Sequence, residues 1–356
     1  MHSKPILKIA MVDFWRGIQP KDKERYLSLF RHDYNVVEVR ENPDLLLYSC
    51  FGVEHFEYEN VPRLFICGEN IVPDFNTCDY AIGTVKIQFA NKSLWVPEAY
   101  YVSHFPSPES LTLSHDLAKR KFCSFIYSQD IMGAGSKLRR EFCSMLMNTY
   151  KHVDCPGKIL HNMESEKLSA RNDGSSWHDS KISFLRDYKF NIAFENSSAP
   201  GYITEKLVDC YMANTVPIYW GSEGDVTPYP KESMICANDY PDLESLCARI
   251  KEVDENDELY FKILAANPFR PENKDYLPNF NLQIRQFINS IIENKSPIPR
   301  TDSPLTDAHR CHTYIVERNK FQYKIIRLIS YYISKVIRKA KGLFRNFGTT
   351  SKKSRE

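Results

Sequence analysis

The chain has 356 residues, of which 42% are hydrophobic and 13% aromatic, the composition of a globular protein with about two domains, each large enough for its own core. The formal net charge of +2 is unevenly spread: residues 318–356 carry a net +11, which leaves −9 on residues 1–317. A body of that sign excludes the basic surface that nucleic-acid binding requires.

The ten cysteines include no C-x-x-C pair, and several fall inside apolar, strand-like runs. This pattern predicts free, buried thiols in a reducing compartment, and it argues against a zinc site or a disulfide framework. The amino-terminal segment has too short an apolar run, and too many polar residues, for a signal peptide or a membrane anchor. We therefore expect the body to stay in the compartment where it is made.

Apolar runs in the first third predict an α/β domain. We expect strands near residues 6–15, 34–39, 45–49, 64–67 and 80–82, and a helix over 21–30 that buries Tyr26, Leu27 and Phe30. The strand at 64–67 is followed by Gly68 and Glu69. An acid just past a strand end lies at the carboxyl edge of a parallel sheet, where ligands bind; the alternative is a solvated turn residue.

Residues 84–121 are rich in proline, serine and aromatic residues, and they predict a domain linker near 105–120. A strand over 122–127 is expected to open the second domain. It is followed by a glycine-containing loop and an amphipathic helix with Arg139 and Arg140 in its first turn. Cations at that end oppose the helix dipole unless an anion neutralises them, so we expect an anion there or, alternatively, two solvated arginines.

The stretch 189–221 predicts a parallel crossover of strand, polar loop, helix and strand. Thr204 is the expected N-cap of the helix, Lys206 lies in its first turn, and Asn214 closes it. Pro217 predicts a bulge or an end position in the second strand. Free N–H groups, the helix dipole and Lys206 together favour an anion. The alternative is an ordinary surface unit with solvated charges.

The remaining chain predicts a strand near 234–236 and helices at 243–253, 255–266 and 282–293, followed by a proline-rich linker at 296–304. His309, Cys311 and His312 lack a second ligand pair, which argues against a metal site. Residues 323–347 form a basic amphipathic pattern typical of a helix at an anionic bilayer surface. The alternative is a helix packed on the body or on a twin subunit.

Four segments carry a family resemblance: GENIVPDFNTCDYAIG at 68–83, and FENS, GYITEK and VPIYWG within 189–221. They resemble the α-1,3/4-fucosyltransferases (glycosyltransferase family 10), in the bacterial type without an N-terminal membrane span. The resemblance covers most of residues 45–290. It implies two facing Rossmann-like domains of GT-B type, and transfer of L-fucose from GDP-fucose, with inversion, to N-acetylglucosamine in a Lewis-type glycan. An α-1,3 link is favoured over α-1,4.

The resemblance also implies roles for particular residues. Glu69 matches the position of the catalytic base. The positions that match donor-binding residues are Arg139, Lys158, Asn196, Tyr202, Glu205 and Lys206, with their division among guanine, ribose and fucose left open. The chain has no Asp-x-Asp motif, so we expect no essential metal and at most a secondary stimulation by Mn²⁺.

These inferences define three regions: an acceptor-binding domain at 1–115, a GDP-fucose-binding domain at 116–300, and a linker with a basic amphipathic tail at 301–356. We expect a cytoplasmic protein, peripheral on the inner face of the membrane through residues 323–347, with no nucleic-acid partner. Two alternatives stay open: a transferase of the same architecture that uses another nucleotide sugar, and an inactive glycan-binding, membrane-associated protein.

Overall fold

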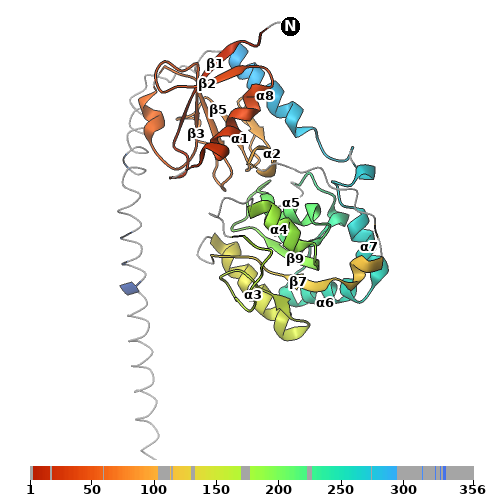
Figure 1. The fold of residues 1–356 in the computed structure, drawn as a ribbon. Coiled ribbons are helices and arrows are strands. Elements are labelled where there is room, and N and C mark those ends of the chain that lie inside the picture. Colours follow the sequence, from red (N-terminus) through yellow and green to blue (C-terminus); the bar gives the residue numbers. More distant parts are fainter. Residues whose placement is uncertain are drawn as a thin grey trace, which may run out of the picture.

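The computed structural model describes residues 3–102 except 17 and 59, then 113, 115–129, 133–169, 177–222 and 227–294 except 274, and single positions 315, 325, 329, 332 and 333. These residues form two parallel α/β sheets that follow one another along the chain, and they make the two bodies seen in Figure 1. The predicted α/β class, with its parallel sheets, is confirmed.

The first sheet has the strand order β2-β1-β3-β4-β5-β6, and all its pairs are parallel. Its strands are β1 (Ile6–Val12), β2 (Asn35–Glu38), β3 (Leu45–Tyr48), β4 (Arg63–Cys67), β5 (Tyr80–Gly83) and β6 (Ser93–Trp95). The helices are α1 (Pro20–Arg31), which buries Tyr26, Leu27 and Phe30 as predicted, and α2 (Ala99–Val102). Strand β6 was not predicted, because its half-buried residues show no clear period.

The second sheet has the order β11-β10-β9-β7-β8 and is also parallel throughout. Its strands are β7 (Lys121–Ser124), β8 (Val153–Asp154), β9 (Tyr188–Phe194), β10 (Val216–Trp220) and β11 (Ile235–Cys236). Helices α3 (Gly133–Thr149), α6 (Leu243–Asp254) and α7 (Asp257–Ala265) share a core on one face. On the other face lie α4 (Trp177–Leu185) and α5 (Glu205–Met212).

Short 3-10 helices complete the described elements: η1 (Glu54–Glu57), η2 (His115–Lys119), η3 (Lys231–Ser233), η4 (Ala237–Asp239) and η5 (Pro271–Asn273). Strand β1 ends before the predicted residue 15, and strand β7 ends before the predicted residue 127. Pro217 causes no bulge, since it pairs in register with Asn191 of β9. Strand β11 pairs with β10 only from Ile218 onward, so the proline sits where that side of β10 is open.

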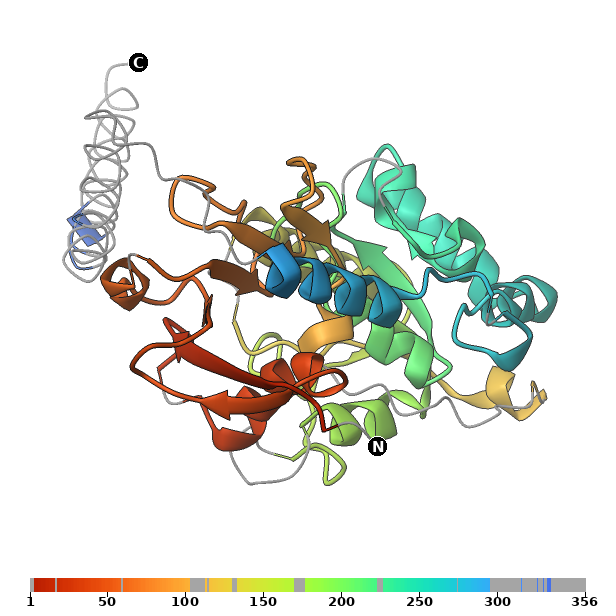
Figure 2. The same ribbon diagram turned by 90° about the horizontal axis from the view of Figure 1, so that it is seen from above.

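Helix α8 (Phe280–Asn294) corrects the predicted domain assignment, which placed it in the second domain. Its apolar face, formed by Phe280, Ile284, Ile288 and Ile291, enters the core of the first sheet. The guanidinium of Arg285 donates two hydrogen bonds, of 2.7 and 2.6 Å, to Asp33 beyond α1. Figure 2 shows α8 lying across the elements of the first domain. The apolar spacing predicts the helix but does not specify which sheet it covers.

The predicted tail lies almost entirely outside the described residues, as do His309, Cys311, His312 and the linker at 296–304, so the inferences about these segments stay predictions. Ile325, Ile329, Tyr332 and Ile333 are described, and their side chains are exposed. Within the described ranges, no helix is long and apolar enough to cross a membrane. The nine described cysteines are free thiols.

Candidate active site

A cavity of about 810 Å³ lies between the two domains, and residues of both line it. The first domain contributes residues that follow its strands, including Phe51, Gly68, Glu69 and Glu98. The second domain contributes Tyr127 and the predicted donor positions Arg139, Lys158, Asn196, Tyr202, Glu205 and Lys206. The structure thus brings every residue of the predicted site to one cavity.

Glu69 lies just beyond β4, at the carboxyl edge of the first sheet, and it is exposed. Its backbone is held on both sides. The Glu69 N–H donates to Cys67 Sγ at 3.3 Å, and Thr84 Oγ1 donates to the Glu69 carbonyl at 3.1 Å. The fixed backbone and exposed side chain leave the carboxylate accessible to a molecule in the cavity.

Helix α5 forms the facing part of the second domain. Thr204 is its N-cap, as predicted: it has an extended backbone, and its Oγ1 accepts the Lys206 N–H at 3.5 Å. Asn214 follows the last turn with a left-handed φ of 54°, a conformation that asparagine tolerates better than most residues. The local signals for both ends of this helix are therefore confirmed.

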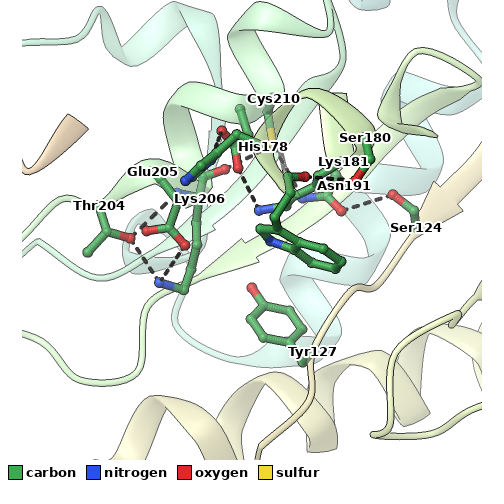
Figure 3. Close-up of polar contacts among 12 residues, drawn as sticks. Ser124, Tyr127, His178, Ser180, Lys181, Asn191, Thr204, Glu205, Lys206 and Cys210 are labelled. Atoms are coloured by element: carbon green, nitrogen blue, oxygen red, sulfur yellow. Dashed lines mark hydrogen bonds and ion pairs between the residues drawn. The ribbon is translucent and has the colours of Figure 1, made fainter. Parts of the chain in front are cut away.

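A buried ion pair joins α5 to the end of β9. Glu195 follows β9 and is fully buried, and its Oε2 lies 3.0 Å from Lys206 Nζ. The same ammonium lies 2.9 Å from Thr204 Oγ1 and 3.5 Å from Glu205 Oε1 (Figure 3). Burial alone would lower the pKa of Lys206, but Glu195 and Glu205 outweigh it and hold that pKa well above its usual range. Lys206 is therefore charged at neutral pH.

The N-terminus of α5 is not open, contrary to the expectation of free N–H groups. The Thr204 N–H donates to Glu195 Oε1 at 2.8 Å, and the Glu205 N–H donates to Glu98 Oε2 at 3.1 Å. Carboxylates thus already occupy these donors. On this wall, the cationic side chains are therefore the groups that attract an anion. Glu195 partly neutralises the charge of one of them, Lys206.

Glu98 is a site residue that the sequence analysis missed. It belongs to the first domain and packs against Gly68, where a Cβ atom would lie 2.9 Å from Glu98 Cγ. Burial raises the pKa of the Glu98 carboxyl well above its usual range, and the nearby Glu205 raises it further. Glu98 lies in a proline- and aromatic-rich segment and is not part of any recognisable sequence motif. Its place in the site becomes visible only from its contact with the second domain.

Arg139 lies in the second turn of α3, not in the first as predicted, because the helix begins at Gly133. Two glycines allow this early start. A Cβ atom at Gly133 would lie 2.5 Å from the Asn196 carbonyl oxygen, and one at Gly135 would lie 2.2 Å from that of Glu195. The first turn of α3 therefore packs directly on the backbone that follows β9.

Arg139 is 3% exposed, and contacts on several sides hold its guanidinium. It lies 3.9 Å from the centroid of the Tyr127 ring, and it donates to Asn196 Oδ1 at 2.8 Å and to the Gln129 carbonyl at 2.5 Å. Two predicted donor residues are thus directly bonded to each other. Arg140 is exposed, as predicted.

The other two predicted donor residues differ in exposure. Lys158, beyond β8, is exposed on the cavity wall. Tyr202 is 2% exposed, and burial raises the pKa of its hydroxyl well above the usual range. Lys158 can therefore reach an anion in the cavity directly, whereas Tyr202 reaches a ligand only with a small part of its ring or hydroxyl.

A second polar cluster, formed by His178, Lys181 and Asp209, acts electrostatically on Glu205. Lys181 Nζ lies 2.8 Å from Asp209 Oδ2, and His178 Nδ1 lies 3.3 Å from Asp209 Oδ1 (Figure 3). Burial alone would raise the pKa of Glu205, but the charges of Lys206, Lys181 and His178 outweigh it and hold that pKa well below its usual range. In the part of the chain that the structure describes, no group of three or more His, Cys, Asp or Glu side chains is placed to hold a metal ion.

The loop after β9, residues 196–203, also joins the two domains. Asn70 Nδ2 donates to Ser197 Oγ at 2.8 Å, and Trp95 Nε1 donates to the Gly201 carbonyl at 3.1 Å. Gly201 has a φ of 78°, and a Cβ atom there would lie 2.5 Å from Trp95 Nε1. The residue next to Glu69 is therefore tied to the loop that leads into α5.

Two parallel α/β domains enclose a cavity with an exposed acid on one wall and basic side chains on the other, which is the arrangement expected of a two-domain, GT-B-like glycosyltransferase. Comparison with protein families agrees. Residues 9–102 match the alpha-(1,3)-fucosyltransferase FucT N-terminal domain, and residues 118–266 match the C-terminal part of glycosyltransferase family 10 (fucosyltransferase). The chain belongs to glycosyltransferase family 10.

Individual relatives extend this result. The chain is 27% identical over 332 residues to alpha-(1,3)-fucosyltransferase FucT of Helicobacter pylori, which covers 82% of this chain and 67% of that protein. It is 30% identical over 165 residues to GDP-fucose protein O-fucosyltransferase 3 of Xenopus tropicalis, covering 46% of this chain and 32% of that one. A crystal structure of an alpha1,3-fucosyltransferase with GDP shares the fold, with a TM-score of 0.65, 24% identity, and coverage of 85% of this chain and 94% of that chain.

The ion pair generates a first prediction. Lys206→Ala should lower the free energy of unfolding by about 3–5 kcal/mol, because it leaves the buried Glu195 carboxylate without its partner. It should also weaken GDP binding. Denaturant titration measures the first effect, and calorimetry with GDP measures the second.

The double variant Lys206→Ala/Glu195→Gln separates the two effects, since it removes the unpaired charge. It should regain most of the stability but not the affinity for GDP. Lys158→Ala, an exposed change on the same wall, should leave stability within about 0.5 kcal/mol of wild type. If the single variant Lys206→Ala unfolds at the wild-type denaturant concentration, the pair does not hold the loop and the helix together.

Proposed function

We propose that the protein is an inverting α-1,3-fucosyltransferase that transfers L-fucose from GDP-fucose to a hydroxyl of N-acetylglucosamine in a Lewis-type glycan. One observation carries the proposal: a single cavity contains an exposed acid from the first domain and basic side chains from the second. Membership of a fucosyltransferase family supports GDP-fucose as the donor. The match of the N-terminal region to an alpha-(1,3)-fucosyltransferase domain supports the linkage. The preference for α-1,3 over α-1,4 rests on that likeness.

The reaction assigns one step to each wall. Glu69 removes the proton from the acceptor hydroxyl, and the hydroxyl oxygen then forms a bond to C1 of fucose on the face opposite the nucleotide. The bond from C1 to the diphosphate oxygen breaks, and GDP leaves with the electron pair. Arg139, Lys158 and Lys206 stabilise the negative charge on the diphosphate. A single displacement inverts the anomeric centre, so the β-linked donor gives an α-fucoside.

Two alternatives predict different ligand responses. A transferase that uses another nucleotide sugar would be stabilised against heat by GDP-mannose or a UDP-sugar more than by GDP-fucose. An inactive glycan-binding protein would neither transfer fucose nor hydrolyse GDP-fucose. The polar contacts that fix Arg139 on Asn196 and Lys206 on Glu195 favour an intact donor site over the inactive alternative.

Glu69→Gln should lower fucose transfer by roughly 10²-fold or more, because an amide cannot accept the proton from the acceptor. The dissociation constant for GDP should stay within about twofold of wild type, since Glu69 belongs to the opposite wall. Initial rates with N-acetyllactosamine and GDP-fucose measure the first effect, and calorimetry measures the second. Glu41→Gln, an exposed change outside the cavity, is the matched control. More than a tenth of wild-type turnover in Glu69→Gln would remove Glu69 from the role of base.

We also propose that catalysis needs no metal ion, because three fixed or exposed cations line the wall where the diphosphate is expected. Fucose transfer should therefore continue in EDTA at close to its original rate, and Mn²⁺ should change that rate only severalfold. The measurement is the initial rate before and after chelation, with full dialysis. Loss of transfer in EDTA, with recovery only on addition of a divalent ion, would contradict the metal-free mechanism.

A further inference from the structure

Among the large hydrophobic side chains that are exposed in the described part of the chain, Phe51 is the one that lines the cavity. It follows β3 at the carboxyl edge of the first sheet, is 49% exposed, and lines the cavity. Trp15, which follows β1 at the same edge, also lines the cavity and is half-buried. The two rings meet edge to face, with centroids 6.4 Å apart and an interplanar angle of 83°.

The backbone around these rings is held by Asp13. The Asp13 carbonyl accepts the Phe51 N–H at 2.9 Å, and its carboxylate accepts the N–H groups of Glu54 and His55, each at 2.9 Å. The His55 ring adds a contact from Nδ1 to Asp13 Oδ2 at 2.6 Å. Asp13 has a left-handed φ of 58°. One residue thus ties the loop carrying Phe51 to the segment carrying Trp15.

Gly52 shows how tightly this arrangement is packed. A Cβ atom there would lie 2.2 Å from Asp13 Oδ1, so only glycine can follow Phe51 without displacing the carboxylate. Trp15 also packs on Tyr26 of α1, with ring centroids 6.4 Å apart and an interplanar angle of 60°. The two aromatic rings are therefore held in place before any ligand binds, which reduces the entropy lost on binding.

Phe51 also lies close to the candidate base along the sheet. Its neighbour Cys50 contacts Cys67 on β4, with the two sulfur atoms 3.5 Å apart, and Cys67 Sγ accepts the Glu69 N–H at 3.3 Å. An exposed aromatic ring one strand away from an acid suits a ligand that has apolar C–H faces and hydroxyl groups. A pyranose ring has both, because its axial C–H groups form an apolar face that an electron-rich aromatic face attracts.

We infer that Phe51 and Trp15 form a platform on which a sugar ring of the acceptor stacks, so that a neighbouring hydroxyl reaches Glu69. This inference rests on the proposed function and specifies its acceptor subsite. The platform belongs to the wall opposite Arg139 and Lys206, so it should act on acceptor binding alone. Phe51 is half-exposed, and its truncation removes the platform with little effect on the core.

Phe51→Ala should raise the KM for N-acetyllactosamine about three- to tenfold, the loss expected for one aromatic contact. The KM for GDP-fucose and the slow hydrolysis of GDP-fucose without acceptor should not change. Phe51→Tyr keeps the ring and should restore the acceptor KM. Phe89→Ala is the matched control, since Phe89 is 47% exposed and stacks on Phe75 but does not line the cavity. It should leave both KM values at the wild-type level.

Saturation-transfer NMR with the full chain, GDP and N-acetyllactosamine tests the contact directly and does not depend on turnover. Irradiation of aromatic protons should saturate the ring C–H protons of one sugar, and Phe51→Ala should weaken that signal severalfold. An acceptor KM or a saturation signal unchanged in Phe51→Ala would overturn the platform. A wild-type protein that shows the signal without transferring fucose would leave the platform supported and refute the proposed function. A wild-type protein without the signal would refute the platform.

Discussion

The ion pair between Glu195 and Lys206 is the constraint on which the site depends. Two charges that have left water must satisfy each other, and Glu195 has no exposed surface, so the end of β9 and the first turn of α5 are fixed relative to each other. Thr204 completes the cluster by donating through its backbone N–H and hydroxyl to the same carboxylate. Between these residues the chain makes the loop of residues 196–203, whose ends therefore cannot move apart without separating the charges.

That loop transmits the constraint to the first domain. Asn70 and Trp95 bond to the loop, and Glu98 bonds to the first turn of α5. Asn70 directly follows Glu69, so the contacts that join the domains also set the distance between the candidate base and the donor wall. In the proposed mechanism the base and the leaving group belong to different domains, and this arrangement would let the acceptor and the donor meet in line. The carboxyl group of Glu98 is buried at this contact between the domains, and its burial raises its pKa and so favours its protonated form.

Local signals predicted much of this structure, whereas contacts between distant segments were not predictable from the sequence. The N-cap at Thr204, the end of α5 at Asn214 and the position of Glu69 after β4 each depend on a few neighbouring residues, and all three are confirmed. The start of α3 was placed too late, because its glycines suggest a loop when the strand backbone against which they pack is unknown. The same limit applies to Glu98, to the burial of Glu195 and to the sheet that α8 covers. Each depends on a partner far away in the sequence.

A crystal structure of the protein with GDP would locate the diphosphate relative to the two walls of the cavity. We expect the diphosphate to lie against the second domain, within hydrogen-bonding distance of Lys158 and Lys206 and close to Arg139. We also expect Lys206 to remain paired with Glu195, and Glu69 to face the nucleotide across an empty acceptor space. A diphosphate bound on the first-domain wall beside Glu69, or a Lys206 side chain that has left Glu195, would contradict both the division of roles between the walls and the part assigned to the ion pair.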